Sequence, residues 1–295
     1  MDEPRIEVLE DGLRRLVAPN PGPMTFRGTN TYLVGWHELA VIDPGPDSAA
    51  HMEAILAACG DGARITHILV THSHLDHSPL ARPLARETGA KIHAFGPHDA
   101  GRRTVMKDLA RTGLAGGGEG IDADFRPDER LEDGGLITGD GWQISALHTP
   151  GHLSNHMSFA WRGALFSGDH IMGWSTSLVS PPDGDLRAFM RSCDRIAART
   201  DRIAYPGHGD PVADPAGRAR DLISHRKARE TQILAALTRG QTTLEGLTRT
   251  VYTDLDPRLL GAATRNVLAH LIDLWEGGTV TATPTLGASA RFALA

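Results

Sequence analysis

The chain has 295 residues, of which 40% are hydrophobic and 22% charged, so its composition excludes wholesale disorder and allows a large hydrophobic core. It contains no apolar run of about 18 residues, which excludes a transmembrane helix, and residues 1–7 lack the layout of a signal peptide. The two cysteines, Cys59 and Cys193, are too few for a disulfide framework or a thiolate zinc site. We therefore expect a cytoplasmic protein without a membrane partner.

The charge is divided unevenly along the chain. Residues 1–214 carry 20 Lys+Arg and 29 Asp+Glu, a net charge of −9, whereas residues 215–295 carry 10 and 7, a net charge of +3, and the two parts sum to −6. An acidic main body argues against a surface built for polyanions, while the mildly basic C-terminal part leaves nucleic acid open as a partner.

Strands and single helices alternate through the first two thirds of the chain. The predicted strands cover residues 32–35, 39–43, 65–70, 92–95, 142–148, 157–161, 164–167 and 202–205. The predicted helices cover residues 48–58, 79–88 and 185–199, and a Gly-rich loop is expected over 112–120. This pattern, repeated in two halves, favours stacked sheets with helices outside them.

The pattern changes after Asp214. Three helices are expected over 216–238, 242–251 and 257–276, followed by two strands over 279–282 and 290–293 that pair with each other. Three helices and a terminal hairpin are the plan of a winged helix. We therefore predict two domains, residues 1–213 and 214–295. In the third helix, Trp275 and a stripe of apolar residues are expected to form the core of the small domain: Leu268, Leu271 and Ile272.

A dense group of metal-binding side chains directly follows the predicted strand 65–70. It consists of His72, His74, Asp76 and His77. Residues two apart on extended chain point the same way, so His72 and His74 can share one ion. Where the chain turns into the next helix, Asp76 and His77 can reach a second ion. Imidazole and carboxylate without thiolate suit zinc, with manganese or iron(II) as alternatives.

Three further candidates stand where later strands end. His152 follows a turn containing a glycine, Asp169 follows the strand 164–167, and His208 follows the strand 202–205. With the first four, they provide seven nitrogen or oxygen ligands, enough for two divalent ions that share one carboxylate.

In identity, order and spacing, these residues resemble the metallo-beta-lactamase fold superfamily. The resemblance rests on His72-x-His74-x-Asp76-His77, Gly151-His152, Gly168-Asp169 and Gly207-His208, and it covers roughly residues 10–214. It implies an α+β fold, an αββα sandwich with the metals at the edge of the two sheets. It also implies His72, His74 and His152 on one zinc ion, Asp76, His77 and His208 on the other, and Asp169 between them. One departure is Ser78-Pro79 where many members have Gly-Gly, which touches the start of a helix rather than a ligand.

A narrower likeness points to the beta-lactamase-like protein 2 group. It rests on the opening Asn20-Pro21-Gly22-Pro23 with Gly28-Thr29-Asn30-Thr31-Tyr32, and on His225-Arg226-x-x-Arg229-Glu230. That group also carries a C-terminal winged helix, and it includes a single-strand endoribonuclease and carrier-protein thioesterases.

The ligand set predicts a dinuclear zinc hydrolase that uses a metal-bridging hydroxide, and the resemblance implies that Asp76 both binds metal and orients that hydroxide. No organic cofactor is expected. The acidic main body and the 5% aromatic content favour a small ester, thioester or related acyl substrate over RNA. A single-strand endoribonuclease is the alternative, and a beta-lactamase or a metal-sensing DNA-binding protein is disfavoured. The oligomeric state is not predicted.

Several neighbours of the ligands also have expected roles. Asp43 is expected either to hold a ligand histidine by a hydrogen bond or to cap a turn. We expect a supporting role for His148, and the sequence places His156 and His170 close to ligands. Asn30, Thr31 and residues 174–177 are expected as pocket walls. The remaining histidines are assigned to the surface or to packing: His37, His51, His67, His93, His98, His225 and His270.

Overall fold

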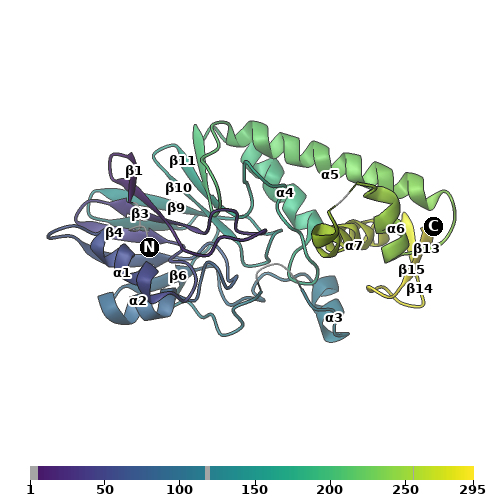
Figure 1. Ribbon diagram of the computed structural model, residues 1–295, viewed down its shortest axis with the longest axis horizontal. Helices are drawn as coiled ribbons and strands as arrows, with labels where there is room; N and C mark the ends of the chain where they lie inside the picture. Colours follow the sequence, from purple (N-terminus) through teal and green to yellow (C-terminus); the bar gives the residue numbers. More distant parts are fainter. Residues whose placement is uncertain (1–5, 117–119, 255) are drawn as a thin grey trace.

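Two stacked β-sheets form the larger part of the molecule in the computed structural model, which describes residues 6–116, 120–254 and 256–295 (Figure 1). The first sheet has seven strands in chain order: β1 (Glu7–Glu10), β2 (Leu13–Val17), β3 (Asn30–Gly35), β4 (Glu38–Ile42), β5 (Arg64–Leu69), β6 (Lys91–Ala94) and β7 (Glu129–Arg130). Strands β1 to β4 are antiparallel, and β4 to β7 are parallel. This places the carboxyl ends of β4, β5 and β6 at one edge.

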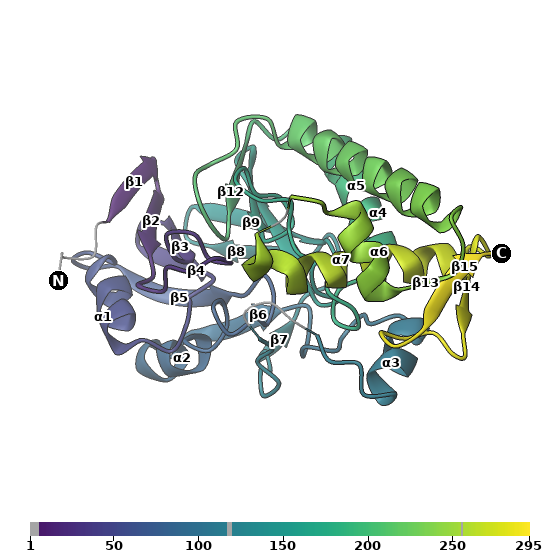
Figure 2. The ribbon, with the colours of Figure 1, turned by 45° about the vertical axis from the view of Figure 1, so that its right-hand side comes forward.

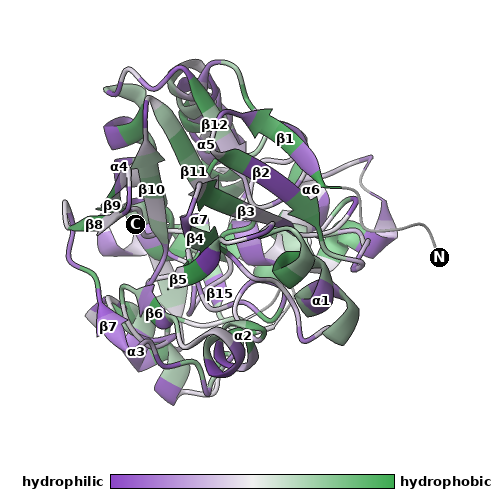
Figure 3. Ribbon diagram, turned by 90° about the vertical axis from the view of Figure 1, so that its left-hand side faces the viewer, coloured by the Kyte–Doolittle hydropathy of each residue, from purple (hydrophilic) through white to green (hydrophobic). Residues whose placement is uncertain are grey.

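The second sheet has five strands in the order β12-β11-β10-β9-β8. They are β8 (Leu136–Gly139), β9 (Trp142–His148), β10 (Met157–Trp161), β11 (Ala164–Gly168) and β12 (Ile203–Pro206). Strands β11 and β12 are parallel, so they also end at a common edge. Apolar side chains between the two sheets include Tyr32 and Val34 on one side and Phe159 and Phe166 on the other. In Figure 3, β3 and β11 are accordingly largely hydrophobic.

Helices cover the outer face of each sheet. Helices α1 (Ala49–Ala57) and α2 (Ala81–Thr88) pack on the first sheet through residues such as Ile55 and Leu84. Helices α4 (Leu186–Ala197) and α5 (Pro215–Leu237) pack on the second through Phe189 and Leu222. The αββα sandwich predicted from the sequence is therefore confirmed.

The C-terminal elements form a winged helix, also as predicted. After α5 come β13 (Thr242–Thr243), α6 (Leu244–Val251), a short 3-10 helix η1 (Pro257–Leu259), α7 (Leu260–Glu276), β14 (Val280–Thr283) and β15 (Arg291–Leu294). Strand β15 lies between β13 and β14 in a small sheet. In Figure 2, α7 and α6 lie beside α5, with this sheet at the C-terminal end. The buried residues Leu268, Leu271 and Ile272 belong to its core, but Trp275 is 40% exposed, so its predicted burial is wrong.

The structure adds elements that the sequence reading did not separate. Helix α3 (Thr104–Arg111) offers only two fully buried apolar residues, Met106 and Leu109, and both pack into the winged-helix core. A short helix of this kind depends on a distant partner, which local periodicity does not show. The sequence analysis also gives no bounds for strands β1, β2 and β8. Of the predicted loop 112–120, residues 117–119 lie outside the described residues. No helix in the described ranges combines the length and apolarity needed to cross a membrane.

Candidate metal centre

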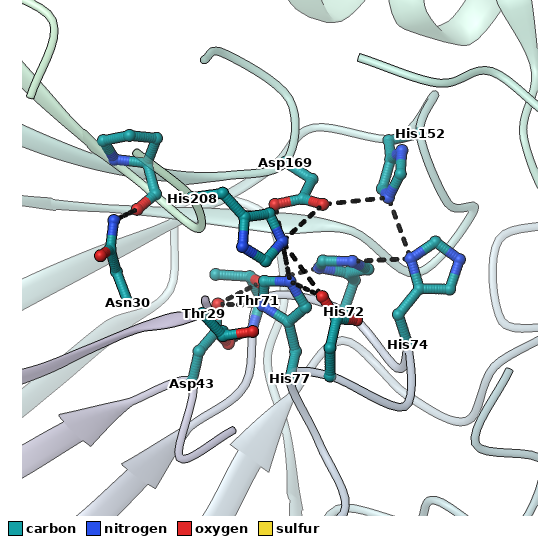
Figure 4. A network of polar contacts seen from close by, with 12 residues as sticks. Thr29, Asn30, Asp43, Thr71, His72, His74, His77, His152, Asp169 and His208 are labelled. Atoms are coloured by element: carbon teal, nitrogen blue, oxygen red, sulfur yellow. Dashed lines mark hydrogen bonds and ion pairs between the residues drawn. The ribbon is translucent and has the colours of Figure 1, made fainter. Parts of the chain in front are cut away.

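All seven predicted ligands lie together at the edge where the strands of both sheets end. Figure 4 labels six of them: His72, His74, His77, His152, Asp169 and His208. Of the seven, four follow β5, one follows the turn after β9, and one each follows β11 and β12. They come from segments that lie far apart in the sequence, and each is at most 6% exposed. The two sheets therefore bring seven buried, metal-ligating side chains to one place.

The first group consists of three imidazoles, those of His72, His74 and His152. The Nδ1 atom of His74 lies 3.0 Å from Nε2 of His72 and 3.0 Å from Nε2 of His152. Zinc–nitrogen distances of about 2.0–2.1 Å put two ligands of one tetrahedral ion about 3.3 Å apart. Burial and the neighbouring histidines lower the pKa of His72 well below its usual value, and that of His74 to about 3. Neutral imidazoles are the form that binds a metal ion.

The second group consists of one carboxylate and two imidazoles. The Oδ2 atom of Asp76 lies 3.0 Å from Nε2 of His208 and 3.4 Å from Nε2 of His77, and the two Nε2 atoms are 3.2 Å apart. Burial alone would lower the pKa of His208, but Asp169 and Asp76 outweigh it and raise that pKa to about 10. Without a cation, His208 therefore holds a proton, which a bound metal ion would displace.

Asp169 lies between the two groups. Its Oδ2 atom is 3.6 Å from Nε2 of His152 and 3.4 Å from Nε2 of His208, whereas its Oδ1 atom is 3.5 Å from Nε2 of His77. Both oxygens of Asp76 and Oδ1 of Asp169 are buried without a well-directed hydrogen bond. Buried carboxylate oxygens without a partner are costly, so the donor set fits divalent cations.

The outward-facing nitrogens of four histidines are held by the surrounding chain. The Nδ1 atom of His152 donates to the carbonyl of Leu178 at 2.7 Å, and that of His208 donates to the carbonyl of Gly28 at 3.2 Å. The Nδ1 atom of His72 is hydrogen-bonded to Thr71 Oγ1 at 2.9 Å, and that of His77 donates to Asp43 Oδ2 at 2.9 Å. Such bonds fix the ring orientations and aim the Nε2 atoms inward, where a bound cation would take the place of any proton.

Comparison with known proteins identifies the family of the chain. Residues 24–208 match the metallo-beta-lactamase superfamily, and residues 243–287 match the beta-lactamase associated winged helix domain. The chain belongs to the metallo-beta-lactamase superfamily. It is a hydrolase of that superfamily, with histidine and aspartate groups suited to divalent metal ions.

Individual relatives cover most of the chain. The beta-lactamase-like protein 2 homolog of Drosophila melanogaster is 32% identical over 93% of this chain and 91% of its own length. The atrochrysone carboxyl ACP thioesterase of Aspergillus fumigatus is 32% identical over 80% of this chain and 68% of its own length. A solved metallo-beta-lactamase family protein from Thermus thermophilus is 27% identical, with a TM-score of 0.77 over 98% of this chain and all of that one.

The sequence predicts for Asp43 either a hydrogen bond to a ligand histidine or a turn cap. Its Oδ1 atom accepts from the backbone N–H of Thr71 at 2.7 Å, and its Oδ2 atom accepts from Thr71 Oγ1 at 2.7 Å and from His77 Nδ1. The hydrogen bond to a predicted ligand is therefore present. Asp43 adopts a left-handed φ of 50°, a strained conformation that these bonds stabilise.

Asn30 and Thr31 do not form pocket walls, contrary to expectation. Both are buried. The Nδ2 atom of Asn30 donates to the carbonyls of Pro206 and Gly209, each at 2.9 Å, and so holds the turn that carries His208. Thr31 donates through Oγ1 to the carbonyl of Asp43 at 2.7 Å. The two residues therefore hold backbone segments that carry His208 and Asp43, rather than lining the cleft.

The neighbouring histidines separate into different roles. His156 accepts at Nε2 from the backbone N–H of Asp169 at 3.2 Å and so helps to position the carboxylate of Asp169. His170 packs on Phe189, with 4.4 Å between ring centroids, and does not reach the inward-facing ligand atoms. His148 stacks on Phe95 at 3.8 Å and has a structural place away from the ligands.

A cleft of about 340 Å³ opens beside the centre. One of its walls carries His74, His152 and Asp169, and another is formed by residues 172 and 174–178, in agreement with the predicted loop wall. The remaining lining residues come from the N-terminal loop, α5 and the winged helix: Pro23, Met24, His225, Arg226, Tyr252, Leu259, Ala262, Ala263 and Asn266. The winged helix therefore lies against the same cleft as the metal-binding side chains.

The sequence reading missed Arg226 and Asn266 as parts of the site. The guanidinium of Arg226 donates to the carbonyls of Thr176 and Ser177 at 2.9 and 2.6 Å, and to Oδ1 of Asn266 at 2.9 Å. Ser177 has a left-handed φ of 57°, so these bonds secure a strained turn. Arg226 belongs to the His225-Arg226-x-x-Arg229-Glu230 motif, which is the one sequence feature that singles it out. That motif does not indicate which residues Arg226 would bind.

Proposed function

We propose that this chain is a dinuclear zinc hydrolase that cleaves an ester or thioester of a small acyl group. His72, His74 and His152 would hold one ion, Asp76, His77 and His208 the other, and Asp169 both. The observation that carries the proposal is the position of Asp169, whose oxygens lie within 3.6 Å of imidazoles from both groups. Three nitrogens in the first group favour zinc, and manganese or iron(II) suits the same donors.

Divalent ions in this place supply Lewis acidity and lower the pKa of water toward neutrality. The chain's own contribution is to fix the ligand atoms and to orient the attacking water. Because Oδ2 of Asp76 faces His77 and His208, its buried Oδ1 atom is free to accept a hydrogen bond from the attacking water. Asp76 would in this way both bind metal and orient the nucleophile.

The substrate class is supported by the lining of the cleft. Arg226 is the one arginine or lysine among the described lining residues, and its Nη atoms are engaged with carbonyl groups. A track for a nucleic-acid backbone needs several free basic side chains. The apolar residues Met24, Met172, Leu178 and Leu259 suit an acyl chain instead. A relative named as an acyl carrier thioesterase adds support.

A panel of substrates tests the proposal. Zinc-loaded protein would be offered an acyl thioester, a lactone, single-stranded RNA, bis-p-nitrophenyl phosphate and a beta-lactam, with the Asp169→Ala variant as the blank. We expect cleavage of the thioester or lactone, loss of activity after dialysis against a chelator, and recovery on adding zinc. RNA cleavage that disappears in the variant, with no ester cleavage, would make the endoribonuclease alternative the correct one.

A further inference from the structure

The cleft has two unlike walls. The metal-side wall carries ligand side chains, whereas the opposite wall comes from the winged helix: Tyr252, Leu259, Ala262, Ala263 and Asn266. All five lie within the part of the chain that matches the associated winged helix domain. The reacting centre and this helical wall therefore enclose a shared space.

The helical wall is mostly apolar. Ala262 and Ala263 on α7 present only methyl groups, and Leu259 is 39% exposed beside them. Met24 and Met172 are further apolar residues in the same lining. Small side chains on one side and flexible thioethers on another leave room for an apolar group and adapt to its shape.

One polar group on this wall has a fixed orientation. The Oδ1 atom of Asn266 accepts from the backbone N–H of Val179 at 3.2 Å and from Nη1 of Arg226 at 2.9 Å. Two donors at Oδ1 identify the other end of the amide as the Nδ2 donor. Within the described residues, this Nδ2 atom makes no hydrogen bond, and Asn266 lines the cleft. It is therefore available to a ligand oxygen.

The charges of the lining restrict the ligand further. Asp169 is the one carboxylate among the described lining residues, and it belongs to the metal centre. Arg226 has no carboxylate within 4.0 Å in the described part of the chain. A cationic group on the substrate would therefore find no carboxylate in this lining apart from Asp169, so the lining disfavours cationic substrates.

We propose that the winged helix supplies the acyl subsite of the enzyme, and that this subsite takes an apolar acyl chain carrying an oxygen substituent. Ala262 and Ala263 set the space available to the chain, and Nδ2 of Asn266 donates to the oxygen substituent. This assignment rests on the proposed hydrolysis of acyl esters or thioesters. It gives the C-terminal domain a direct part in substrate selection.

A steric substitution tests the apolar part of the subsite. In zinc-loaded protein, Ala262→Leu is compared with Ala235→Leu, the same change at an exposed position of α5, on acetyl and decanoyl thioesters of N-acetylcysteamine. We expect kcat/KM for the decanoyl substrate to fall about tenfold in Ala262→Leu, and that for the acetyl substrate to stay within about twofold. Equal effects on the two substrates, or no effect on either, would overturn the proposal.

Binding of product acids tests the polar part independently of turnover. Asn266→Asp keeps an oxygen for Val179 and Arg226 but removes the Nδ2 donor, so the surrounding contacts are retained. By calorimetry on zinc-loaded protein, we expect the wild type to bind 3-methoxydecanoate, whose ether oxygen only accepts, roughly fivefold more tightly than decanoate, and the variant to lose this preference. Unchanged preference in Asn266→Asp would refute the role of Asn266.

The two tests also separate failure of the subsite from failure of the proposed function. If no thioester is cleaved but Ala262→Leu weakens decanoate binding about tenfold relative to Ala235→Leu, the hydrolysis proposal fails and the subsite stands. If thioesters are cleaved and neither variant changes selectivity or binding, the subsite proposal fails alone.

Discussion

The two walls of the cleft are built on different physical principles. On the metal side, every proposed ligand is at most 6% exposed, and the outer nitrogen atoms of four histidines are hydrogen-bonded to the chain behind them. On the helical side, Leu259 is 39% exposed and small alanines face the space. Ligand atoms must be held to within fractions of an ångström, whereas an acyl group needs mainly volume and one or two directed contacts.

The two walls are nevertheless mechanically joined. The segment from Thr176 to Val179 contacts Arg226 and Asn266 on one side, and its Leu178 carbonyl accepts from His152 on the other. A change in the helical region can therefore affect His152, a proposed metal ligand. Substitutions on the metal side are therefore expected to change kcat and metal binding strongly. Substitutions on the helical side are expected to change stability and substrate binding less.

The largest effect is expected for Asp169→Ala. Removing the carboxylate between the two groups should lower kcat roughly 10²–10³-fold or more and reduce the metal content of the purified protein. Elemental analysis and thioester hydrolysis measure both. Asp210→Ala is the control, because Asp210 pairs with Arg27 on the surface and contacts no proposed ligand. Full metal content in Asp169→Ala would contradict the shared role of Asp169.

The next effect is expected for Asp43→Asn. Whichever way the amide turns, Asn offers one oxygen where three donors now converge, those of Thr71 N–H, Thr71 Oγ1 and His77 Nδ1. We expect about 10- to 100-fold weaker metal binding, measured by competition with a chelating dye. The exposed Asp47→Asn serves as control. Equal affinities in the two variants would show that the support of His77 is dispensable.

Arg226→Met tests the connection between the walls. The variant loses the donors to Thr176, Ser177 and Asn266 but also removes a buried cation, so the net loss of unfolding free energy should be about 2 kcal/mol. Urea denaturation measures this loss. The control is Arg220→Met, since Arg220 is exposed and makes one long contact of 3.4 Å. If both variants unfold alike, Arg226 does not secure the loop.

The smallest effect is expected for Phe26→Ala at the mouth of the cleft. Phe26 stacks on Trp174 with 5.1 Å between ring centroids, and Trp174 lines the cleft. Loss of an aromatic contact worth about 1 kcal/mol should raise KM roughly fivefold and leave kcat unchanged. Leu136→Ala, at a position 61% exposed, controls for the loss of a surface apolar group. A fall in kcat would show that Phe26 affects the reacting centre itself.

Much of the metal side was predictable because its residues stand next to strong local signals. His72, His74, Asp76 and His77 follow a buried strand within six positions, and the other ligands each follow a strand or a glycine turn. The helical side lacked such signals. An alanine such as Ala262 is typical of any helix, and the orientation of Asn266 depends on Arg226 forty residues away. The domain boundary near residue 214 and the roles of the seven ligands remain predictions.

Hydrophobic periodicity predicted stacked sheets with outer helices and a C-terminal winged helix, and side-chain chemistry at the strand ends predicted the candidate ligands, because both act over short distances along the chain. The αββα sandwich itself followed from the resemblance of the ligand motifs to a known superfamily. The packing of the sheets and helices was needed to show that Asn30 and Asp43 hydrogen-bond the ligand-bearing segments from behind, and that Trp275 is exposed. It also decided that α7 faces the cleft. These contacts join residues distant in sequence, and they depend on how the sheets and helices pack rather than on any local pattern.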